Sequence, residues 1–216
     1  MKRVALMVVV GVLVVAPMAG CSSTGIAVRE MFGQAKREQL VDRVQDARDG
    51  QEAAKEQFAT TLKEFKALTG YDGGALEDVY DRLKGQLDRS ESRAEAVRQR
   101  ILNVQRVADA MFGEWEDELD EYESENLRRS SEAQLDETRR RYSGMLEAMQ
   151  RAEATMEPVL SKFRDQVLFL KHNLNARAIA SLETSVGDLE SEIGILIREM
   201  EASISEANAF IDEMGA

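Results

Sequence analysis

The sequence predicts an all-α protein, an elongated antiparallel helical bundle or coiled coil of about four long helices that follows a cleaved signal peptide. Apolar residues recur at alternating steps of three and four over most of the chain, as on one face of a helix. Only two prolines, Pro17 and Pro158, and 14 glycines occur in 216 residues, and sheet-rich domains need more turn residues than that. We therefore expect a signal peptide at 1–20, an anchor and short linker at 21–35, and the bundle at 36–216.

The first twenty residues have the layout of a secretory signal. Two cations, Lys2 and Arg3, precede an apolar run from Val4 to Val15, and small residues follow it. A membrane-spanning helix needs about 20 apolar residues, and this run is shorter and is broken by Pro17 and Gly20. We expect the segment to be removed.

Cys21, the only cysteine, directly follows this run and has no disulfide partner in the chain. The stretch Met18-Ala19-Gly20-Cys21 resembles the bacterial lipoprotein box, with methionine where leucine is usual. The resemblance implies that Cys21 is lipidated and becomes the new N-terminus; the alternative is an ordinary signal peptide with a chance cysteine. Several acyl chains hold a protein firmly on a bilayer, so the membrane is the first predicted partner, reached through Cys21. Ser22 stands where aspartate would resemble an inner-membrane retention signal, which favours the periplasmic face of the outer membrane.

The charge of the chain narrows the class of its partners. The formal net charge is -12, and removal of residues 1–20 takes away Lys2 and Arg3 and no acid, so it becomes -14. A strongly acidic surface repels nucleic acid and anionic lipid headgroups. We expect no nucleic-acid partner.

The helical period defines four segments. The first two are joined by a glycine-rich turn at Thr69–Gly74, and the second and third by Ser124–Asn126. Because short connections make neighbouring helices antiparallel, the segments should form hairpins. The longest seam covers about 47 residues, which predicts a rod about 70 Å long. The seam residues of the first two segments are Val44, Ala47, Gln51, Ala54, Phe58, Thr61, Phe65 and Leu68, and then Tyr80, Leu83, Leu87, Ser90, Ala94, Val97, Ile101, Val104, Ala108, Met111, Trp115 and Tyr122.

The second half of the chain keeps the same period but leaves its last turn open. Pro158 lies inside the third seam, and we interpret it as a kink or a local restart. The final reversal is expected near 171–175, with a second candidate at 184–188. The seam residues here are Leu135, Thr138, Tyr142, Met145, Met149, Ala152, Met156, Val159 and Phe163, and then Leu182, Val186, Leu189, Ile193, Leu196, Met200, Ile204, Ala207, Ile211 and Met214, with one stutter between Met200 and Ile204.

Two features of these seams have both a functional and a structural interpretation. Polar seam residues such as Gln51 could line a cavity, but in coiled coils they more often fix register. Eight carboxylates crowd the stretch 114–125, and arginines return after the turn at Asn126. This run lacks the ligand spacing of a calcium loop, so we expect a solvated helix end whose acids face the basic flank.

The sequence offers little chemistry. It contains no phosphate-binding glycine loop, no GxSxG motif and a single histidine, His172. We therefore predict no cofactor, no metal site, no nucleotide partner and no enzymatic activity. His172, Asn173 and Asn175 are kept as a candidate interaction or switch site, because histidine can titrate near neutral pH; the alternative is a helix end that these residues cap.

Several longer stretches resemble one known bacterial family. They are "LVDRVQDARDGQEAAKEQF", "GGALEDVYDRL", "LRRSSEAQLDETRRRY" and above all "MEPVLSKFRDQVLFLKHNLNARAIASLE". Together they resemble the family known as domain of unknown function 2959 over nearly the whole mature chain. The resemblance implies a helical envelope lipoprotein, and it brings no activity or catalytic residue with it.

Three functions follow as hypotheses. The first is a membrane-anchored periplasmic scaffold in the cell envelope that binds an unknown envelope protein or a second copy of itself. The second is a bundle that opens to bind membrane or a lipophilic ligand. The third, a hydrolase that uses carboxylates alone, would depend on Glu157 and His172, the only unusually placed candidates.

Overall fold

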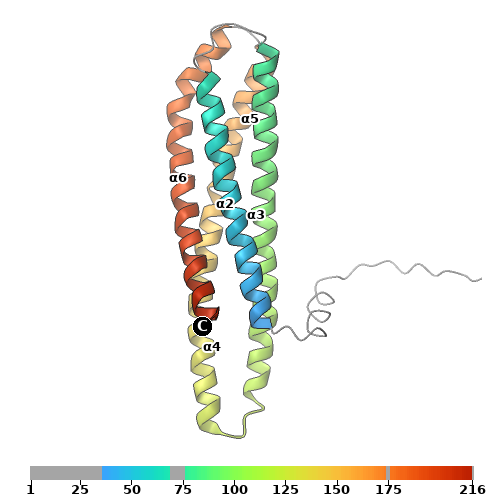
Figure 1. Ribbon diagram of the computed structural model, residues 1–216, viewed down its shortest axis with the longest axis vertical. Helices are drawn as coiled ribbons and strands as arrows, with labels where there is room; N and C mark the ends of the chain where they lie inside the picture. The colour runs from blue at the N-terminus through green and yellow to red at the C-terminus, as the bar shows by residue number, and fades with distance from the viewer. Residues whose placement is uncertain (1–35, 69–75, 174–175, 216) are drawn as a thin grey trace, which may run out of the picture.

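The computed structural model describes residues 36–68, 76–173 and 176–215, and every regular element in them is a helix. The elements are α2 (Lys36–Leu68), α3 (Leu76–Leu119), α4 (Glu125–Ala154), α5 (Met156–His172) and α6 (Ala176–Gly215). Helices α4 and α5 follow one another along a single rod, so the helices form four antiparallel rods (Figure 1). The all-α antiparallel bundle expected from the sequence is thus confirmed. The expected signal, anchor and Cys21 lie outside the described residues.

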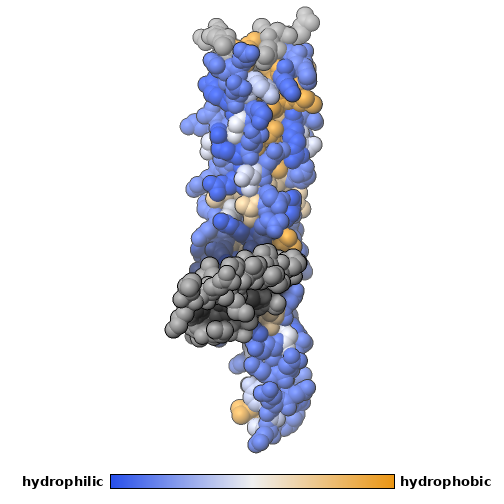
Figure 2. Space-filling model, turned by 90° about the vertical axis from the view of Figure 1, so that its right-hand side faces the viewer, coloured by the Kyte–Doolittle hydropathy of each residue, from blue (hydrophilic) through white to orange (hydrophobic). Residues whose placement is uncertain are grey.

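The rods pack in chain order around a common axis. Helix α2 contacts α3 and α6, while the α4–α5 rod contacts α3 and α6 on the other side. Helices α3 and α4 extend beyond the start of α2 and the end of α6, so one end of the molecule has only two helices (Figure 1). This narrower end is mostly hydrophilic on the face seen in Figure 2, and hydrophobic residues gather in a narrow band along the wider part.

The connection predicted at Ser124–Asn126 is displaced by a few residues: α3 ends at Leu119 and α4 already begins at Glu125, so the connection is 120–124. Ser124 caps α4, because its hydroxyl accepts a hydrogen bond from the Leu127 amide (3.5 Å). Helix α5 ends at His172 and α6 begins at Ala176, so the last reversal lies at the first of the two predicted places and not at 184–188. The turn predicted at Thr69–Gly74 falls on residues outside the described part, between the end of α2 and the start of α3.

Pro158 restarts a helix, as predicted, and causes no reversal. The break between α4 and α5 is the single residue Thr155, whose hydroxyl donates to the Ala152 carbonyl (2.7 Å). Proline has no amide hydrogen and its ring crowds the carbonyl four residues earlier, which here belongs to Ala154. Within the first turn of α5, Pro158 meets no such conflict, so the seam continues across the break.

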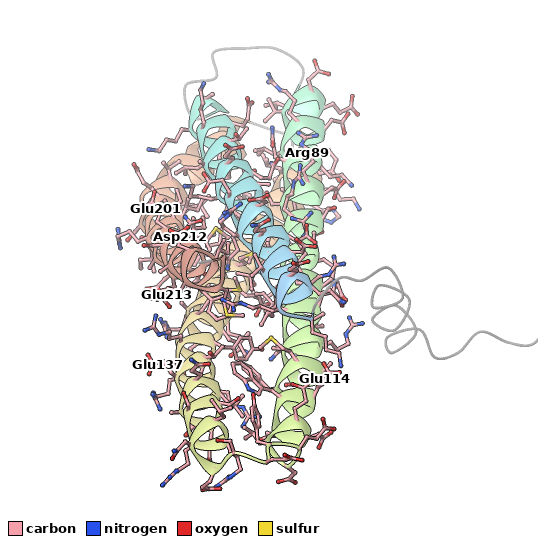
Figure 3. All side chains as sticks on the ribbon, turned by 60° about the horizontal axis from the view of Figure 1, so that its bottom comes forward. Arg89, Glu114, Glu137, Glu201, Asp212 and Glu213 are labelled. Carbon is pink, nitrogen blue, oxygen red and sulfur yellow. The ribbon has the colours of Figure 1, made fainter. Side chains whose placement is uncertain are left out.

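The surface carries the charges, and the labelled acidic and basic side chains of Figure 3 lie outside the bundle. Several ion pairs join different helices there, such as Lys66 Nζ with Glu190 Oε1 (2.6 Å) and Arg164 Nε with Glu91 Oε1 (2.5 Å). Exposed pairs of this kind contribute little to stability individually. The bundle must therefore be held mainly by its apolar core.

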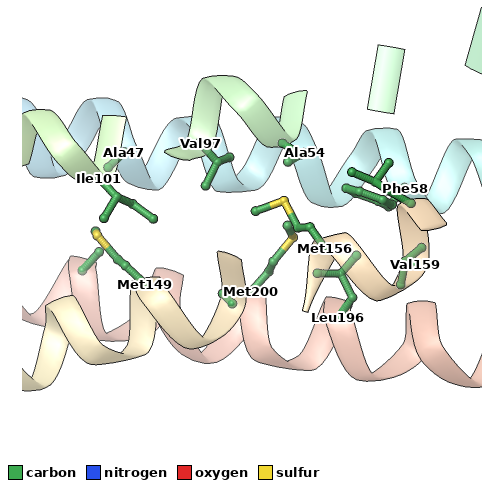
Figure 4. Packing of buried hydrophobic residues seen from close by; sticks show 14 of the residues in the cluster. Ala47, Ala54, Phe58, Val97, Ile101, Met149, Met156, Val159, Leu196 and Met200 are labelled. Atoms are coloured by element: carbon green, nitrogen blue, oxygen red, sulfur yellow. The ribbon is translucent and has the colours of Figure 1, made fainter. Parts of the chain in front are cut away.

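The core is one continuous cluster along the bundle axis. Figure 4 shows a central section, where Met149, Met156 and Met200 pack toward Val97 and Ile101. All three methionines are 2% exposed or less, as is Met145. The methionines of the third seam therefore belong to the core.

Polar residues of the seam are paired across helices. The Ser203 hydroxyl donates to Gln51 Oε1 (2.8 Å) and Gln51 Nε2 donates to the Met149 carbonyl (3.4 Å), while the hydroxyls of Thr61 and Ser90 lie 3.0 Å apart. Gln51, Thr61, Ser90 and Ser203 are all buried. Because buried polar groups bond only in matching positions, these pairs set the relative heights of the helices.

The hydrogen bond between Ser203 and Gln51 explains why the stutter predicted in the last seam is absent. The buried positions run Met200, Ser203, Ala207 and Phe210 in regular steps, while Ile204 is only half-buried. Ile204 was predicted in the core because isoleucine is the apolar residue at this point of the seam, and this prediction was wrong. Ser203 is buried instead, because its hydroxyl donates a hydrogen bond to the buried Gln51 side chain. In the same way Phe210 replaces the predicted Ile211 as the buried residue.

One glycine of α2 lies directly against an arginine side chain of α3. Gly50 is buried, and a β-carbon placed there would lie 2.6 Å from Nη1 and 2.8 Å from Cδ of Arg100. Arg100 crosses above this glycine and donates to the Asp46 carbonyl (2.9 Å). The missing side chain of Gly50 is what lets the arginine pack flat against α2.

Candidate interaction site

The site with the clearest shape is the step at which the four-helix bundle becomes two helices. At this level Lys36 Nζ of α2 pairs with Glu114 Oε2 of α3 (2.9 Å), and Glu213 of α6 pairs with Arg141 of α4. Residues 115–140, which project past these contacts, are called the hairpin extension below. The extension continues α3 and α4 without α2 and α6 to cover them.

A groove of about 740 Å³ lies at this step. Its apolar lining comes from all the helices that meet there except α2: Met111 and Trp115 of α3, Ala133 of α4, and Phe210 and Met214 of α6. Met111 and Phe210 are buried, whereas Trp115 and Met214 are half-buried and Ala133 is exposed. The groove is therefore an open continuation of the bundle core, and we call it the step groove.

The rim of the step groove carries both signs of charge. Three cations face four carboxylates among the lining residues, which are Lys36, Arg37 and Arg141 against Glu114, Glu118, Glu137 and Glu213. Figure 3 shows Glu114, Glu137 and Glu213 on three different helices around it. The rim is nearly balanced in charge, in contrast to the acidic protein as a whole.

One contact of the rim joins the start of α2 to the end of α6. Arg37 Nε of α2 donates to the Met214 carbonyl of α6 (2.8 Å). The last carbonyls of a helix have no partner within it and carry partial negative charge, so a guanidinium stabilises that end. The start of α2 and the end of α6 are thus fixed to each other at the edge of the groove.

A hydrogen bond fixes the orientation of the Trp115 ring in the wall of the groove. Its indole Nε1 donates to the Ser131 hydroxyl across the hairpin (2.8 Å). Next to it, the rings of Phe112 and Tyr142 meet edge to face with centroids 5.4 Å apart. Because the indole nitrogen is already bonded, a ligand in the groove would meet Trp115 through the apolar part of its ring.

The aromatic cluster joins α3 and α4 to α6 next to the base of the extension. Tyr142 also packs against Phe210 with centroids 6.4 Å apart, and the Arg139 guanidinium lies 5.1 Å from the centre of the Phe112 ring. Burial raises the pKa of Tyr142 well above its ordinary value, so this phenol stays protonated at physiological pH. The cluster positions the helices and supplies no titrating group.

The acidic run has a different arrangement from the one expected. Only Arg139 pairs across the hairpin, with Glu116, and its hydrogen bond lowers the pKa of that carboxyl. The remaining arginines of α4 pair mainly within one helical turn, as Arg128 does with Glu125. The prediction that acidic and basic flanks face each other therefore holds for one pair, because side chains three or four residues apart on a helix meet more easily.

Tyr122 is a second correction in this region. It was expected on the core seam, but α3 ends at Leu119 and Tyr122 lies in the connection to α4 with 41% of its surface exposed. The amides of Asp120 and Glu121 bond three residues back, to Asp117 and Glu118, so the chain has already left the helix at this point.

The predicted switch residues lie at the opposite end of the molecule. His172 is exposed in the last turn of α5. Asn173 follows it, with its side-chain amide donating to the Phe169 carbonyl (3.0 Å) and its backbone amide to the Leu170 carbonyl (3.1 Å). Asn173 therefore has the geometry of the helix cap that was the alternative prediction. Asn175 lies outside the described residues, and a switch at this site stays a prediction.

The residues of the carboxylate-only hypothesis are not brought together. Glu157 is in the first turn and His172 in the last turn of α5, about 22 Å apart along the helix axis. Glu157 accepts a hydrogen bond from Arg164 (2.6 Å), which lowers the pKa of its carboxyl. A general acid needs the opposite shift.

Two further properties concern only the described residues. Within the ranges 36–68, 76–173 and 176–215, histidine and acidic side chains form no group with the geometry to hold a metal ion. No helix in that part of the chain combines the length and apolarity required to cross a membrane.

The sequence did not single out the step groove. Trp115 was recognised as a seam residue, but a seam residue is expected to be covered. The available signal was the unequal length of the segments, since α3 has 44 residues and α2 has 33. A seam that outlasts its partners must leave part of its apolar face open.

Comparison with known proteins agrees with the resemblance noted from the sequence. No curated protein sequence and no solved structure shows significant similarity to this chain. A family model described as "Protein of unknown function (DUF2959)" matches residues 26–214, which include all of α2, α3, α4 and α5 and nearly all of α6. The chain therefore belongs to the family of proteins of unknown function DUF2959.

Proposed function

We propose that this chain is a lipid-anchored scaffold of the bacterial cell envelope, which binds an envelope protein at the step groove. The anchor is Cys21 and the location is the periplasmic face of the outer membrane, both argued from the residues around the cysteine. A family of unknown function contributes no activity to this proposal.

The step groove is the observation that carries the proposal. Trp115 and Ala133 leave apolar surface open at the point where a rigid four-helix body ends. Partner helices commonly dock through apolar residues in such grooves, and partly exposed aromatic residues often provide most of the binding energy. The balanced rim adds specificity, because a partner must match charges of both signs.

The hairpin extension gives the groove a long wall for such a partner. Lining residues run from Ser130 to Arg141 on α4, about 16 Å of helix, and from Met111 to Glu118 on α3, about 10 Å. A partner helix of two to three turns fits these dimensions. Since Lys36 lines the groove, only residues 22–35 separate this site from the proposed anchor at Cys21.

Photo-crosslinking in living cells tests the proposal. Benzoylphenylalanine would replace Gln134, which lines the groove, or as a matched control Ser161, which is exposed on α5 outside it. We expect a discrete adduct with another envelope protein from position 134 and none from position 161. Equal labelling from both positions, or no adduct from either, would refute the scaffold proposal.

The anchor is tested separately. The variant Cys21→Ser should lose incorporation of labelled fatty acid and should leave the membrane fraction. If wild-type protein incorporates no fatty acid, the lipid anchor is wrong and the partner site has to be considered without it.

One observation supports the alternative function, in which the bundle opens to bind membrane. Leu168 and Phe169, adjacent near the end of α5, are 55% and 40% exposed. Flotation of the protein with neutral lipid vesicles, compared with the variant Leu168→Ser/Phe169→Ser, tests this function. Flotation no greater than that of the variant would remove it.

A further inference from the structure

We infer that the protein bound at the step groove is a second copy of this chain, which inserts its own hairpin extension where α2 and α6 are absent. The inference rests on the proposed function, because it names the partner of the groove. The two extensions would lie side by side around a twofold axis, each covering the open face of the other. Three observations support this arrangement: the directions of the helices, the apolar face of the extension and the charges at the helix ends.

The helix directions suit an antiparallel pair of extensions. Helices α2 and α4 run away from the narrow, two-helix end of the molecule, whereas α3 and α6 run toward it (Figure 1). A second copy turned by half a turn about an axis perpendicular to the rods would place its α3 in line with α2 and its α4 in line with α6. Each inserted helix then has the direction of the helix that it continues. Together the two extensions would form a short four-helix bundle whose neighbouring rods are all antiparallel.

The extension has an apolar face that this arrangement would cover. On α4, steps of three and four residues connect Leu127, near the tip, to the groove-lining residues Gln134 and Arg141. Leu127 is 59% exposed, and Ala133 and Trp115 are open at the base of the same face. In a twofold pair the tip of one extension lies over the base of the other. Leu127 of each copy would therefore reach the step groove of the other copy and lose its contact with water.

The centre of the α4 stripe suits contact with an identical residue. Gln134 is midway between Leu127 and Arg141, so the two copies of Gln134 would lie nearest the twofold axis. Residues at such an axis meet their own copies, and a charged residue there would face a like charge. Gln134 is exposed and uncharged, and its amide can both donate and accept hydrogen bonds.

Opposite charges would meet where α3 of one copy approaches α2 of the other. The end of α3 and the connection after it are acidic, with Glu118, Asp120 and Glu121. The start of α2 carries Lys36 and Arg37, which both line the groove. The dipoles agree with these charges, because the partly negative end of one helix faces the partly positive start of the next.

The second pair of helix ends has the complementary charges. The first turns of α4 carry Arg128 and Arg129, and the last turn of α6 carries the exposed acids Asp212 and Glu213 (Figure 3). Both arginines pair with Glu125 of their own helix. Exposed pairs of this kind contribute little individually, so the arginines can exchange them for the acids of a second copy.

The size of the contact predicts a reversible pair. The stripe from Leu127 to Arg141 is about 21 Å long, which is short for the interface of a permanent dimer. The pair should therefore separate on dilution. Anchoring on one membrane, as proposed above, would favour it by raising the local concentration of the copies.

Photo-crosslinking of the purified full chain tests the inference in the absence of other proteins. Benzoylphenylalanine replaces Gln134, and copies with two different tags are mixed before irradiation. We expect an adduct of doubled mass that contains both tags, increases with protein concentration and joins position 134 to residues 127–141 of the second copy. Position 161, exposed on α5, is the matched control and should give no such adduct. No adduct from position 134, or an equal yield from both positions, would overturn the inference.

Charge reversal at the tip shows whether the capture depends on the predicted contacts. The variant Arg128→Glu/Arg129→Glu should lower the yield about fivefold or more, because acids would then face the acids of α6. Carboxylates near the start of a helix are favourable, so α4 should persist, and far-ultraviolet circular dichroism verifies this. The variant Arg89→Glu/Arg93→Glu, at exposed positions of α3 in the four-helix part, changes the net charge equally and should leave the yield unchanged. Equal yields in the two variants would contradict the arrangement.

The cellular crosslinking described above separates this inference from the proposed function. An adduct of doubled mass in cells, together with the same adduct from purified protein, supports both. If purified protein gives no adduct and cells give one with a different envelope protein, the scaffold stands and the second copy is wrong. If purified protein gives the doubled adduct and cells give no adduct at all, the pairing of extensions stands and the scaffold is wrong.

Discussion

The four-helix part of the molecule and the hairpin extension contain the same two helices, α3 and α4, in different surroundings. In the bundle, α3 residues such as Val97 and Val104 are fully buried by four rods, and polar residues such as Ser90 bond to a neighbouring helix. In the extension, Trp115 is only half-buried and Leu127 is 59% exposed. A helical seam therefore specifies a face for burial, but the neighbouring helices decide how much of it is covered.

The largest difference between the two regions should be seen when an apolar side chain is removed. Phe58→Ala, in the bundle, should lower the free energy of unfolding by about 3–5 kcal/mol, because it leaves a cavity in a packed core. Leu127→Ala, at the tip of the extension, should change it by about 0.5 kcal/mol or less, as is usual for exposed positions. Urea unfolding followed by circular dichroism measures both. Similar losses would mean that the extension is buried in solution, for example by a second molecule.

Removal of a hydroxyl group should show a smaller difference in stability between the bundle and the extension than removal of an apolar side chain. Ser203→Ala should cost about 1–3 kcal/mol, because Gln51 loses its donor in a buried site. Ser131→Ala removes the acceptor of the Trp115 indole, but water can reach the half-buried ring, so the loss should be about 1 kcal/mol or less. The same unfolding measurement applies to both variants.

A double variant sharpens this prediction. If Gln51→Leu is combined with Ser203→Ala, both partners of the buried bond are removed together, and the combined cost should be smaller than the sum of the two single costs. Additive costs would show that the contact does not couple α2 to α6.

The smallest expected effect is the pH dependence of one ion pair in the extension. Arg139 lowers the pKa of Glu116, so the carboxylate is more stable in the folded than in the unfolded protein. The stabilisation is present above the ordinary carboxyl pKa and is lost as the pH falls through the lowered value. Unfolding of wild-type protein and Glu116→Gln should therefore differ at neutral pH and converge in acid. A difference that persists in acid would show that the substitution acts through packing.

The predictions from sequence were strongest where one helix determines the outcome. The period identified most of the buried positions of α3, and Ser124 and Pro158 marked the boundaries of α4 and α5 because capping and the missing proline amide act within one turn. Ile204 was wrongly preferred to Ser203 because the reason for a buried hydroxyl lies on another helix, at Gln51. Tyr122 was wrongly placed on the seam because its apolar ring continues the pattern after α3 has ended.

The sequence by itself determined the helical class, the approximate place of the connection between α3 and α4, and the family, because each of these depends on local spacing or on stretches of residues in order. Only the tertiary structure decided that α3 and α4 extend past α2 and α6, and that Lys36, Trp115, Ala133 and Met214 meet around one groove. These residues are far apart in the chain, and nothing local sets the heights at which four helices align. That alignment depends on contacts between helices, such as the bond from Ser203 to Gln51.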